Sequence, residues 1–268
     1  MQKYQQLEQE FAKFTGKKYA VALNSGTSAL HLGLLALGIK KGDEVIIPDF
    51  TFVACAFAVS YIGAKPVFVD CKDDYTIDEN LIERKITKKT KAIMPVHVYS
   101  NKCAMDKIMK IAKKYKLKVI EDCSEHHAVK LSKSDVACYS LQSSKQIHCQ
   151  EGGILVTDSK TIYDEVNKLK GFYNNGYYFH QKLSFNYRMP NATAELALRS
   201  LKAFKGKDWV TIHLCKTEKE RDNIIKNTPG TRCFFKPLST MPMYKKKPGK
   251  NAERLSKLGY IKYICKHN

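Results

Sequence analysis

The chain has 268 residues, 44% of them hydrophobic, and carries a formal net charge of +20. A chain of this length and composition can bury a substantial core, so we expect one large globular domain, alone or with a small appendage. Its apolar runs all fall short of the roughly 18 residues that a membrane helix needs, so no membrane partner is expected.

The positive charge is spread along the chain rather than gathered in one patch. Almost all of it is lysine on expected helix faces and turns, and the one tight cluster is residues 245–247. A dispersed charge is typical of a solvated surface, so nucleic-acid binding is not favoured. A cationic field would also suit a small anionic substrate, such as a nucleotide sugar.

The N-terminal segment and the cysteines indicate a cytoplasmic protein. Residues 1–10 lack the apolar core of a signal peptide and are typical of the start of an amphipathic helix. The nine cysteines form no Cys-x-x-Cys pair and show no regular spacing. We therefore expect reduced thiols, with no disulfide framework and no metal site.

Helix-like and strand-like runs alternate over the first half of the chain. The patterns predict helices over 3–14, 28–37, 51–61 and 105–115, and strands over 19–23, 45–48, 67–69, 92–98 and 118–121. This alternation predicts an α/β protein with a doubly wound, mainly parallel central sheet and helices on both faces. Ligands of such sheets bind beyond the carboxyl ends of the strands.

The pattern changes after about residue 200. A strand over 209–214, a charged helix over 218–226 and a short strand over 231–235 predict a small α+β unit. We therefore expect a large domain over 1–200 and a small, shortened C-terminal domain over 201–268.

Lys145 and Asp122 are the most informative pair of residues. Lys145 lies between a run of small polar residues and Gly152-Gly153, and Asp122 follows the apolar run at 117–120. A lysine that can form a Schiff base and an aspartate that keeps a pyridine nitrogen protonated are the minimum set for pyridoxal phosphate (PLP) chemistry. Asp122 could equally be an N-cap or half of an acidic surface pair with Glu121.

Residues 24–28, Asn-Ser-Gly-Thr-Ser, follow an expected strand and open an expected helix. Free N–H groups at a helix N-terminus, together with small hydroxyls, make a seat for phosphate. An ordinary helix N-cap explains the same residues, and this motif alone favours the N-cap.

Three side chains near strand ends have both a functional explanation and a purely structural one. Phe52 follows the expected strand over 45–48, where its ring would stack on a flat heterocycle or simply belong to the core. His126 and His127 lie in the loop after Asp122. They could act as acid–base groups or as ligands, but paired histidines in a loop more commonly have no direct role.

Taken in order, these motifs resemble the DegT/DnrJ/EryC1/StrS sugar aminotransferases, a branch of the fold-type I PLP enzymes. The resemblance runs from about residue 7 to 260, and its order along the chain makes it specific. The matching segments are 21–32, 42–48, 51–54, 63–70, 93–99, 119–122, 151–153, 186–189, 231–235 and 241–244.

The resemblance implies roles at the reacting end of the cofactor. Lys145 matches the lysine that binds the cofactor covalently and moves the proton. Asp122 matches the residue paired with the pyridine nitrogen, and Phe52 the residue stacked on the ring. Glu125 matches the position facing the phenolic oxygen, and glutamate there resembles the branch acting on GDP-4-keto-6-deoxymannose, the perosamine synthases. One of these two oxygen groups should hold a proton, because two adjacent negative charges repel.

The resemblance also implies a phosphate site and a shared active site. Gly26, Thr27 and Ser140 match phosphate contacts. Asn186 matches a residue that reaches the phosphate from the neighbouring subunit, so a homodimer is implied. The implied reaction moves an amino group from glutamate to the C4 ketone of a nucleotide-linked 4-keto-6-deoxysugar. Such aminosugars feed polysaccharide biosynthesis.

The chain departs from the family in several places. It is shorter than is usual, with a curtailed loop between His127 and Ala137 and little of the long helix expected after residue 200. Residues 148–150, His-Cys-Gln, replace a more typical Thr-Thr-Gly, and Ser100 stands where glycine is common. A degenerate, non-catalytic member that acts as a binding or partner subunit therefore stays open. A 3-dehydratase is less favoured, because those relatives replace the lysine with histidine.

Overall fold

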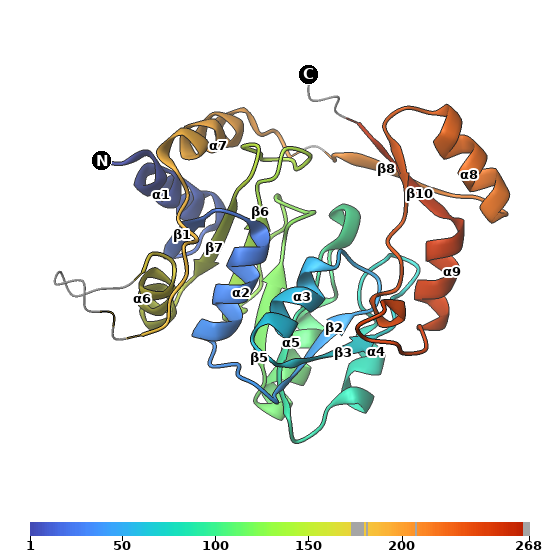
Figure 1. Ribbon diagram of the computed structural model, residues 1–268, viewed down its shortest axis with the longest axis horizontal. Coiled ribbons are helices and arrows are strands. Elements are labelled where there is room, and N and C mark those ends of the chain that lie inside the picture. The colour runs from blue at the N-terminus through green and yellow to red at the C-terminus, as the bar shows by residue number, and fades with distance from the viewer. Residues whose placement is uncertain (173–179, 181, 207, 265–268) are drawn as a thin grey trace.

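The computed structural model describes residues 1–172, 180, 182–206 and 208–264. A seven-stranded sheet forms its centre, in the order β1-β7-β6-β5-β4-β2-β3 (Figure 1). The strands are β1 (Tyr19–Leu23), β2 (Glu44–Pro48), β3 (Lys65–Val69), β4 (Thr90–Ile93), β5 (Lys118–Asp122), β6 (Val136–Ser140) and β7 (Gly153–Thr157). Strands β3, β2, β4, β5 and β6 are parallel, whereas β7 pairs antiparallel with β6 and β1. The prediction of a mainly parallel α/β sheet is confirmed.

Helices cover both faces of the sheet because successive strand residues point to opposite sides. On β7, Leu155 faces the helices α2, α3 and α6, whereas Ile154 and Val156 face α1 and α7. Helix α5 packs on this second face against buried hydrophobic side chains of β2, β4 and β5. The helices are α1 (Lys3–Thr15), α2 (Gly26–Ala36), α3 (Ala54–Tyr61), α4 (Glu79–Ile82), α5 (Met105–Tyr115), α6 (Lys160–Leu169) and α7 (Asn191–Ala203).

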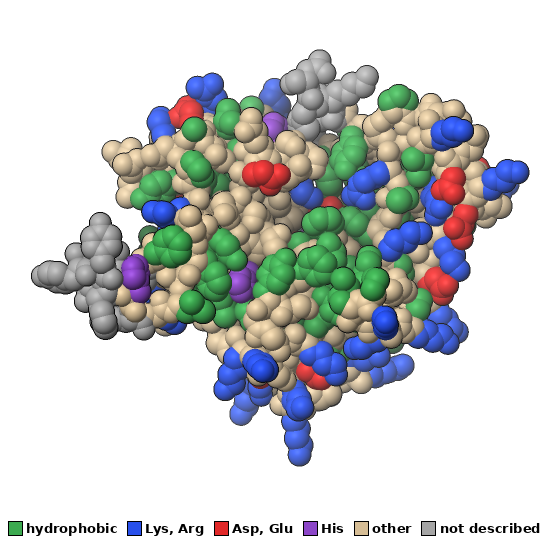
Figure 2. All heavy atoms as spheres, viewed as in Figure 1, with side chains coloured by type: hydrophobic (Ala, Val, Ile, Leu, Met, Phe, Trp, Pro, Cys, Tyr) green, Lys and Arg blue, Asp and Glu red, His purple; other side chains and the backbone are tan. Residues whose placement is uncertain are grey.

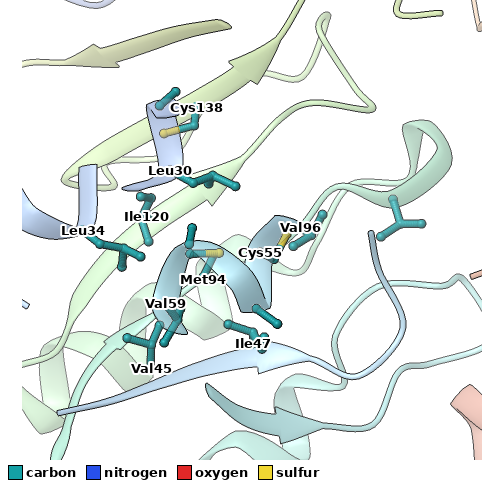
Figure 3. Close-up of a cluster of buried hydrophobic side chains, with 14 of the residues drawn as sticks. Leu30, Leu34, Val45, Ile47, Cys55, Val59, Met94, Val96, Ile120 and Cys138 are labelled. Atoms are coloured by element: carbon teal, nitrogen blue, oxygen red, sulfur yellow. The ribbon is translucent and has the colours of Figure 1, made fainter. Parts of the chain in front are cut away.

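Helix α2 is the central buried helix. Every residue from Ser28 to Leu34 is buried, so its sequence shows no polar face. A Cβ at Gly33 would lie 2.8 Å from Ile120 Cδ1, so glycine there lets α2 approach β5 closely. Figure 3 shows Leu30 and Leu34 of α2 and Val59 of α3 beside side chains of the sheet and of the segment after β4: Val45, Ile47, Met94, Val96 and Ile120.

The C-terminal part forms a separate three-stranded antiparallel sheet in the order β8-β10-β9. Its elements are β8 (Val210–Leu214), α8 (Glu218–Asn227), β9 (Thr231–Cys233), α9 (Lys250–Leu258) and β10 (Gly259–Tyr263). The segment between β9 and α9 returns to the large sheet, where the Asp49 carboxylate accepts hydrogen bonds from Ser239 N, Ser239 Oγ and Gly249 N. The division into domains at residue 200 stays a prediction.

The structure differs from the sequence-based elements in two ways. The strand predicted over 92–98 ends at Ile93, because Pro95 has no N–H to donate and Tyr99 has a left-handed φ of 50°. The elements α4, β6, β7, α6, α7, α9 and β10 were not predicted. The others lie within a few residues of their predicted bounds.

The surface carries its charge in many places. Figure 2 shows Lys and Arg side chains around the lower and right-hand edges of one face, with hydrophobic side chains gathered across its middle. Within the described residues, no helix is both long enough and apolar enough to span a membrane.

Candidate active site

A cleft of about 550 Å³ lies where β2, β4, β5 and β6 end at their carboxyl termini. This is the edge at which parallel sheets bind ligands. Its lining comes from both sheets: Ser25, Gly26, Thr27, Leu30, Thr51, Phe52, Ala54, Val96, Asp122, Ser124, Glu125, Ser140, Gln142, Ser144, Lys145, Glu151, Trp209, Arg232, Phe235 and Tyr263. Seven of the eight sequence-predicted site residues are in this set, and Asn186 is not.

The N-terminus of α2 forms one end of the cleft. Ser25 is the N-cap, and its hydroxyl accepts a hydrogen bond from Ser28 N at 3.1 Å. The first N–H groups of a helix have no partner within the helix, so those of Gly26 and Thr27 are suited to an anion. A Cβ at Gly26 would lie 2.8 Å from Ser140 Cβ, so glycine brings the helix end and the Ser140 hydroxyl together.

Asp122 lies at the floor of the cleft, 4% exposed. Its Oδ1 accepts a hydrogen bond from Ser124 N at 2.9 Å, and its Oδ2 one from the Cys55 thiol at 3.1 Å. A thiol is a weak donor, and burial together with the Asp122 charge raises the pKa of Cys55 well above its usual range, which keeps it protonated. None of the ion pairs in the described residues includes Asp122. Such a carboxylate is costly to bury unless a cation joins it.

Lys145 is in a loop after β6 and extends into the cleft. Its Nζ lies 3.4 Å from Glu125 Oε1 and 4.7 Å from the centre of the Trp209 ring. Glu125 is itself buried, and its Oε2 accepts a hydrogen bond from Tyr99 N at 3.1 Å. The amine is therefore held between a carboxylate and an aromatic face, within reach of the cleft.

The Tyr99–Ser100 turn that holds Glu125 is strained. Both residues have left-handed backbone conformations, with φ of 50° and 67°. Ser100 N donates to Glu125 O at 3.0 Å, and Trp209 Nε1 donates to the same carbonyl oxygen at 3.2 Å. Non-glycine residues adopt this conformation at a cost, so these hydrogen bonds hold the turn in place.

Phe52 is at the rim of the cleft with 57% of its surface exposed, so it is not a core residue. Its ring centre lies 6.2 Å from that of Phe235 on the opposite side. An exposed ring at the edge of a cleft is available to stack on a flat ligand.

His127 supports the lysine loop. It is buried, its N donates to Gln146 Oε1 at 2.7 Å, and its Nδ1 accepts from Ile147 N at 2.9 Å. Burial, with a smaller effect of the Lys145 charge, lowers the pKa of His127 to about 3, so the ring is neutral at physiological pH. Neither His127 nor His126 lines the cleft.

A buried polar cluster lies next to the site on β5. The atoms of His97, Glu121 and Cys123 that could bind a metal lie within 4.8 Å of one another. Protein donors already occupy the Glu121 carboxylate: His97 Nε2 at 3.1 Å, and the Ser132 and Ser134 hydroxyls. These serines belong to the short loop after His127, so the cluster fixes this loop to β5.

Four residues at the other end of the cleft were not predicted: Trp209, Arg232, Phe235 and Tyr263. They come from the small sheet and the segment that follows β9. The Arg232 Nε donates to the Tyr263 hydroxyl at 3.0 Å. Trp209 is the only tryptophan of the chain, a compositional signal that our sequence-based predictions did not use.

Asn186 lies outside the cleft and is exposed. Its Oδ1 accepts hydrogen bonds from Arg188 Nε and Nη2, both at 3.3 Å, and its backbone bridges to Gly171. It is not among the residues that line the cleft of its own chain, and its role in a neighbouring subunit stays a prediction.

These residues fit PLP. The helix end beside Ser140 suits the phosphate, the exposed Phe52 ring suits a flat heterocycle, and Lys145 supplies the amine. The strongest observation is Asp122, a buried carboxylate with one amide donor, one weak thiol donor and no cationic partner in the described residues. A protonated pyridine nitrogen would provide that cation. The fold and the cleft thus define a PLP-dependent transferase.

Comparison with known proteins gives the family. Residues 2–210 match the DegT/DnrJ/EryC1/StrS aminotransferase family. A GDP-perosamine synthase of Escherichia coli O157:H7 is 36% identical, over 91% of this chain and 79% of the relative. That of Vibrio cholerae is 33% identical, over 93% and 81%. The crystal structure of S. venezuelae DesV in complex with a ketimine intermediate superposes with a TM-score of 0.85 at 26% identity, over 97% and 83%.

This chain therefore belongs to the DegT/DnrJ/EryC1/StrS aminotransferase family, and the resemblance found in its sequence is confirmed. It is an enzyme that uses PLP.

Proposed function

We propose that this protein transfers an amino group from glutamate to the C4 ketone of a GDP-linked 4-keto-6-deoxysugar. Family membership and its nucleotide-sugar aminotransferase relatives support the reaction class. Three relatives named GDP-perosamine synthase, at 33–40% identity, support the particular substrate. The observation that carries the proposal is the cleft in which Lys145 and Asp122 lie with the N-terminus of α2.

PLP, when bound, supplies an electron sink that lets a carbon next to nitrogen lose its proton. We assign the residues around it as follows. Asp122 keeps a proton on the ring nitrogen by its charge. Lys145 Nζ would carry the proton between donor carbon and cofactor, and Glu125, 3.4 Å away, would hold this amine in the cleft. Gly26, Thr27 and Ser140 bind the phosphate, and Phe52 holds the ring by stacking.

We propose a homodimer in which Asn186 completes the phosphate site of its partner. Phe52 at the rim of the cleft and Tyr61 at the C-terminal end of α3 are both more than half exposed. The hydrophobic band across the middle of the face in Figure 2 is the kind of surface that a second copy would cover. The protein would then work as a cytoplasmic dimer.

Incubation with glutamate and GDP-4-keto-6-deoxymannose tests the proposed reaction. Mass spectrometry should detect a GDP-linked aminosugar and 2-oxoglutarate in equal amounts. UDP- and dTDP-linked 4-keto-6-deoxysugars serve as parallel substrates. Amination of one of these in place of the GDP sugar would contradict the nucleotide assignment, and no amination of any would contradict the function. The non-catalytic alternative has no support in the comparisons.

A further inference from the structure

Arg232 is the arginine of the cleft, and its position is fixed. It extends from β9 of the small sheet, and its Nε and Nη1 donate to the Tyr263 hydroxyl at 3.0 Å and to Cys233 O at 3.1 Å. Its guanidinium lies 4.8 Å from the centre of the Phe235 ring and 5.9 Å from that of Tyr99. These two rings are stacked, with an interplanar angle of 13°.

This guanidinium has no carboxylate partner in the described residues. Of the other arginines, Arg199, Arg221 and Arg254 form ion pairs within the described residues. Arg84 and Arg188 form none there, but both are exposed to solvent, whereas Arg232 is partly buried. A guanidinium has five N–H donors, and the two contacts of Arg232 leave most of them free. The Glu125 carboxylate, which also lines the cleft, is paired with Lys145 instead. The cleft thus holds a fixed, partly buried positive charge without a counter-ion within ion-pair distance.

We propose that Arg232 is the anion subsite of the cleft and binds an oxyanion of the substrate. A planar guanidinium held by aromatic faces and hydrogen bonds is preorganised for a carboxylate or a phosphate, which it binds through two parallel N–H groups. The oxyanion has two possible sources: the carboxylate of the amino donor or the diphosphate of the nucleotide sugar. This inference rests on the proposed function, because that function supplies both anions.

Arg232→Gln is the direct test, with Arg254→Gln as its matched control. Arg254 is an exposed arginine of α9 that pairs with Asp73, outside the cleft. One arm follows the visible absorption of the PLP-loaded protein as glutamate is added. The other measures GDP and UDP binding by calorimetry, since both nucleotides carry the same diphosphate.

We expect Arg232→Gln to lower the affinity for one of the ligands by about tenfold or more, the size expected for the loss of a hydrogen bond to a charged group. If glutamate binding weakens while GDP and UDP binding stays unchanged, Arg232 binds the carboxylate of the amino donor. If GDP and UDP binding weakens while glutamate binding stays unchanged, Arg232 binds the diphosphate. Arg232→Lys keeps the charge but not the planar fork, so it should lie between wild type and Arg232→Gln. Arg254→Gln should match wild type.

Unchanged binding of glutamate, GDP and UDP in Arg232→Gln would overturn the inference. Failure of the proposed function gives a different result: the wild-type protein itself would not respond to glutamate. The nucleotide arm would then still decide whether Arg232 binds an anion, and a wild-type protein that binds neither nucleotide would also count against the subsite. Retention of the PLP band and of the thermal midpoint shows that each variant is folded.

Discussion

The two ends of the cleft differ in how they are built. The cofactor end consists of strand termini and one helix N-terminus of the large sheet, supported by a continuous buried core. The substrate end consists of Trp209, Arg232, Phe235 and Tyr263 from the small sheet and the segment after β9. The two ends nevertheless share one hydrophobic core, because Trp209 and Phe234 pack in the same buried cluster as Leu30 of α2 and Ile120 of the large sheet.

The largest effect should follow from Lys145→Ala. Loss of the amine removes both the covalent link and the proton carrier, so turnover should fall by more than about 10³-fold. The fold should persist, because Lys145 has one ion pair and is not part of the core. The measurement is turnover with glutamate and the keto sugar, beside calorimetry of GDP binding. Substantial turnover in this variant would refute the assignment, and unchanged GDP binding would confirm that the two ends are separate.

Asn186→Ala should weaken PLP retention by about tenfold, the cost of a lost charge-assisted hydrogen bond. Within the described residues of one chain, the hydrogen bonds of this side chain go to Arg188 and none goes to a residue that lines the cleft, so we expect a change at the cleft to come through a partner subunit. Equilibrium dialysis of PLP measures it. Asn191→Ala, an exposed residue at the start of α7, is the control. If both variants retain PLP equally well, the shared site is wrong.

His127, which supports the loop that carries Lys145, should make the free energy of unfolding depend on pH. The folded-state pKa of His127, about 3, lies below its ordinary value of 6.5, so the unfolded chain binds the extra proton between these values. The contribution of neutral His127 to the free energy of unfolding is therefore complete above about pH 6.5 and is lost as the pH falls towards 3. The slope is at most about 1.4 kcal/mol per pH unit.

Urea unfolding at a series of pH values measures this slope. His127→Asn keeps an acceptor for Ile147 N but does not titrate, so its free energy of unfolding should fall less steeply over the same range. Parallel slopes in the two proteins would show that another group is responsible.

The smallest effect should come from Ser100→Gly, at the turn that joins the two ends. Glycine adopts a φ of 67° without strain, so the free energy of unfolding should rise by about 0.5–1 kcal/mol. Ser100→Ala keeps the strain and removes only the hydroxyl, so it should not stabilise. Thermal or urea unfolding of both variants tests this prediction. If Ser100→Gly is no more stable than Ser100→Ala, the turn is not strained.

The cofactor end could be predicted from sequence because its residues follow recognisable local patterns. Asp122 ends an apolar strand, Gly26 and Thr27 open a helix after a strand, and Lys145 precedes a Gly-Gly pair. The edge of a parallel sheet brings such strand ends together whatever their separation along the chain. The matched order of the motifs then named the family.

The substrate end could not be predicted by the same means. Arg232 and Tyr263 meet only because β9 and β10 pair, and β10 has too short an apolar pattern to stand out. Similarly, β7 is antiparallel within an otherwise parallel region, which its sequence does not reveal. Contacts between distant segments depend on packing rather than on local periodicity.

The absorption spectrum of the purified protein tests the central claim most directly. PLP is added first, and a visible band distinct from that of free PLP should appear as Lys145 binds it. Glutamate should then remove this band as the amino group is taken up. A band that forms and bleaches confirms that the cofactor end is intact and works with an amino donor. A spectrum identical to that of free PLP would contradict the account, because the residues that we assign to the cofactor would not bind it.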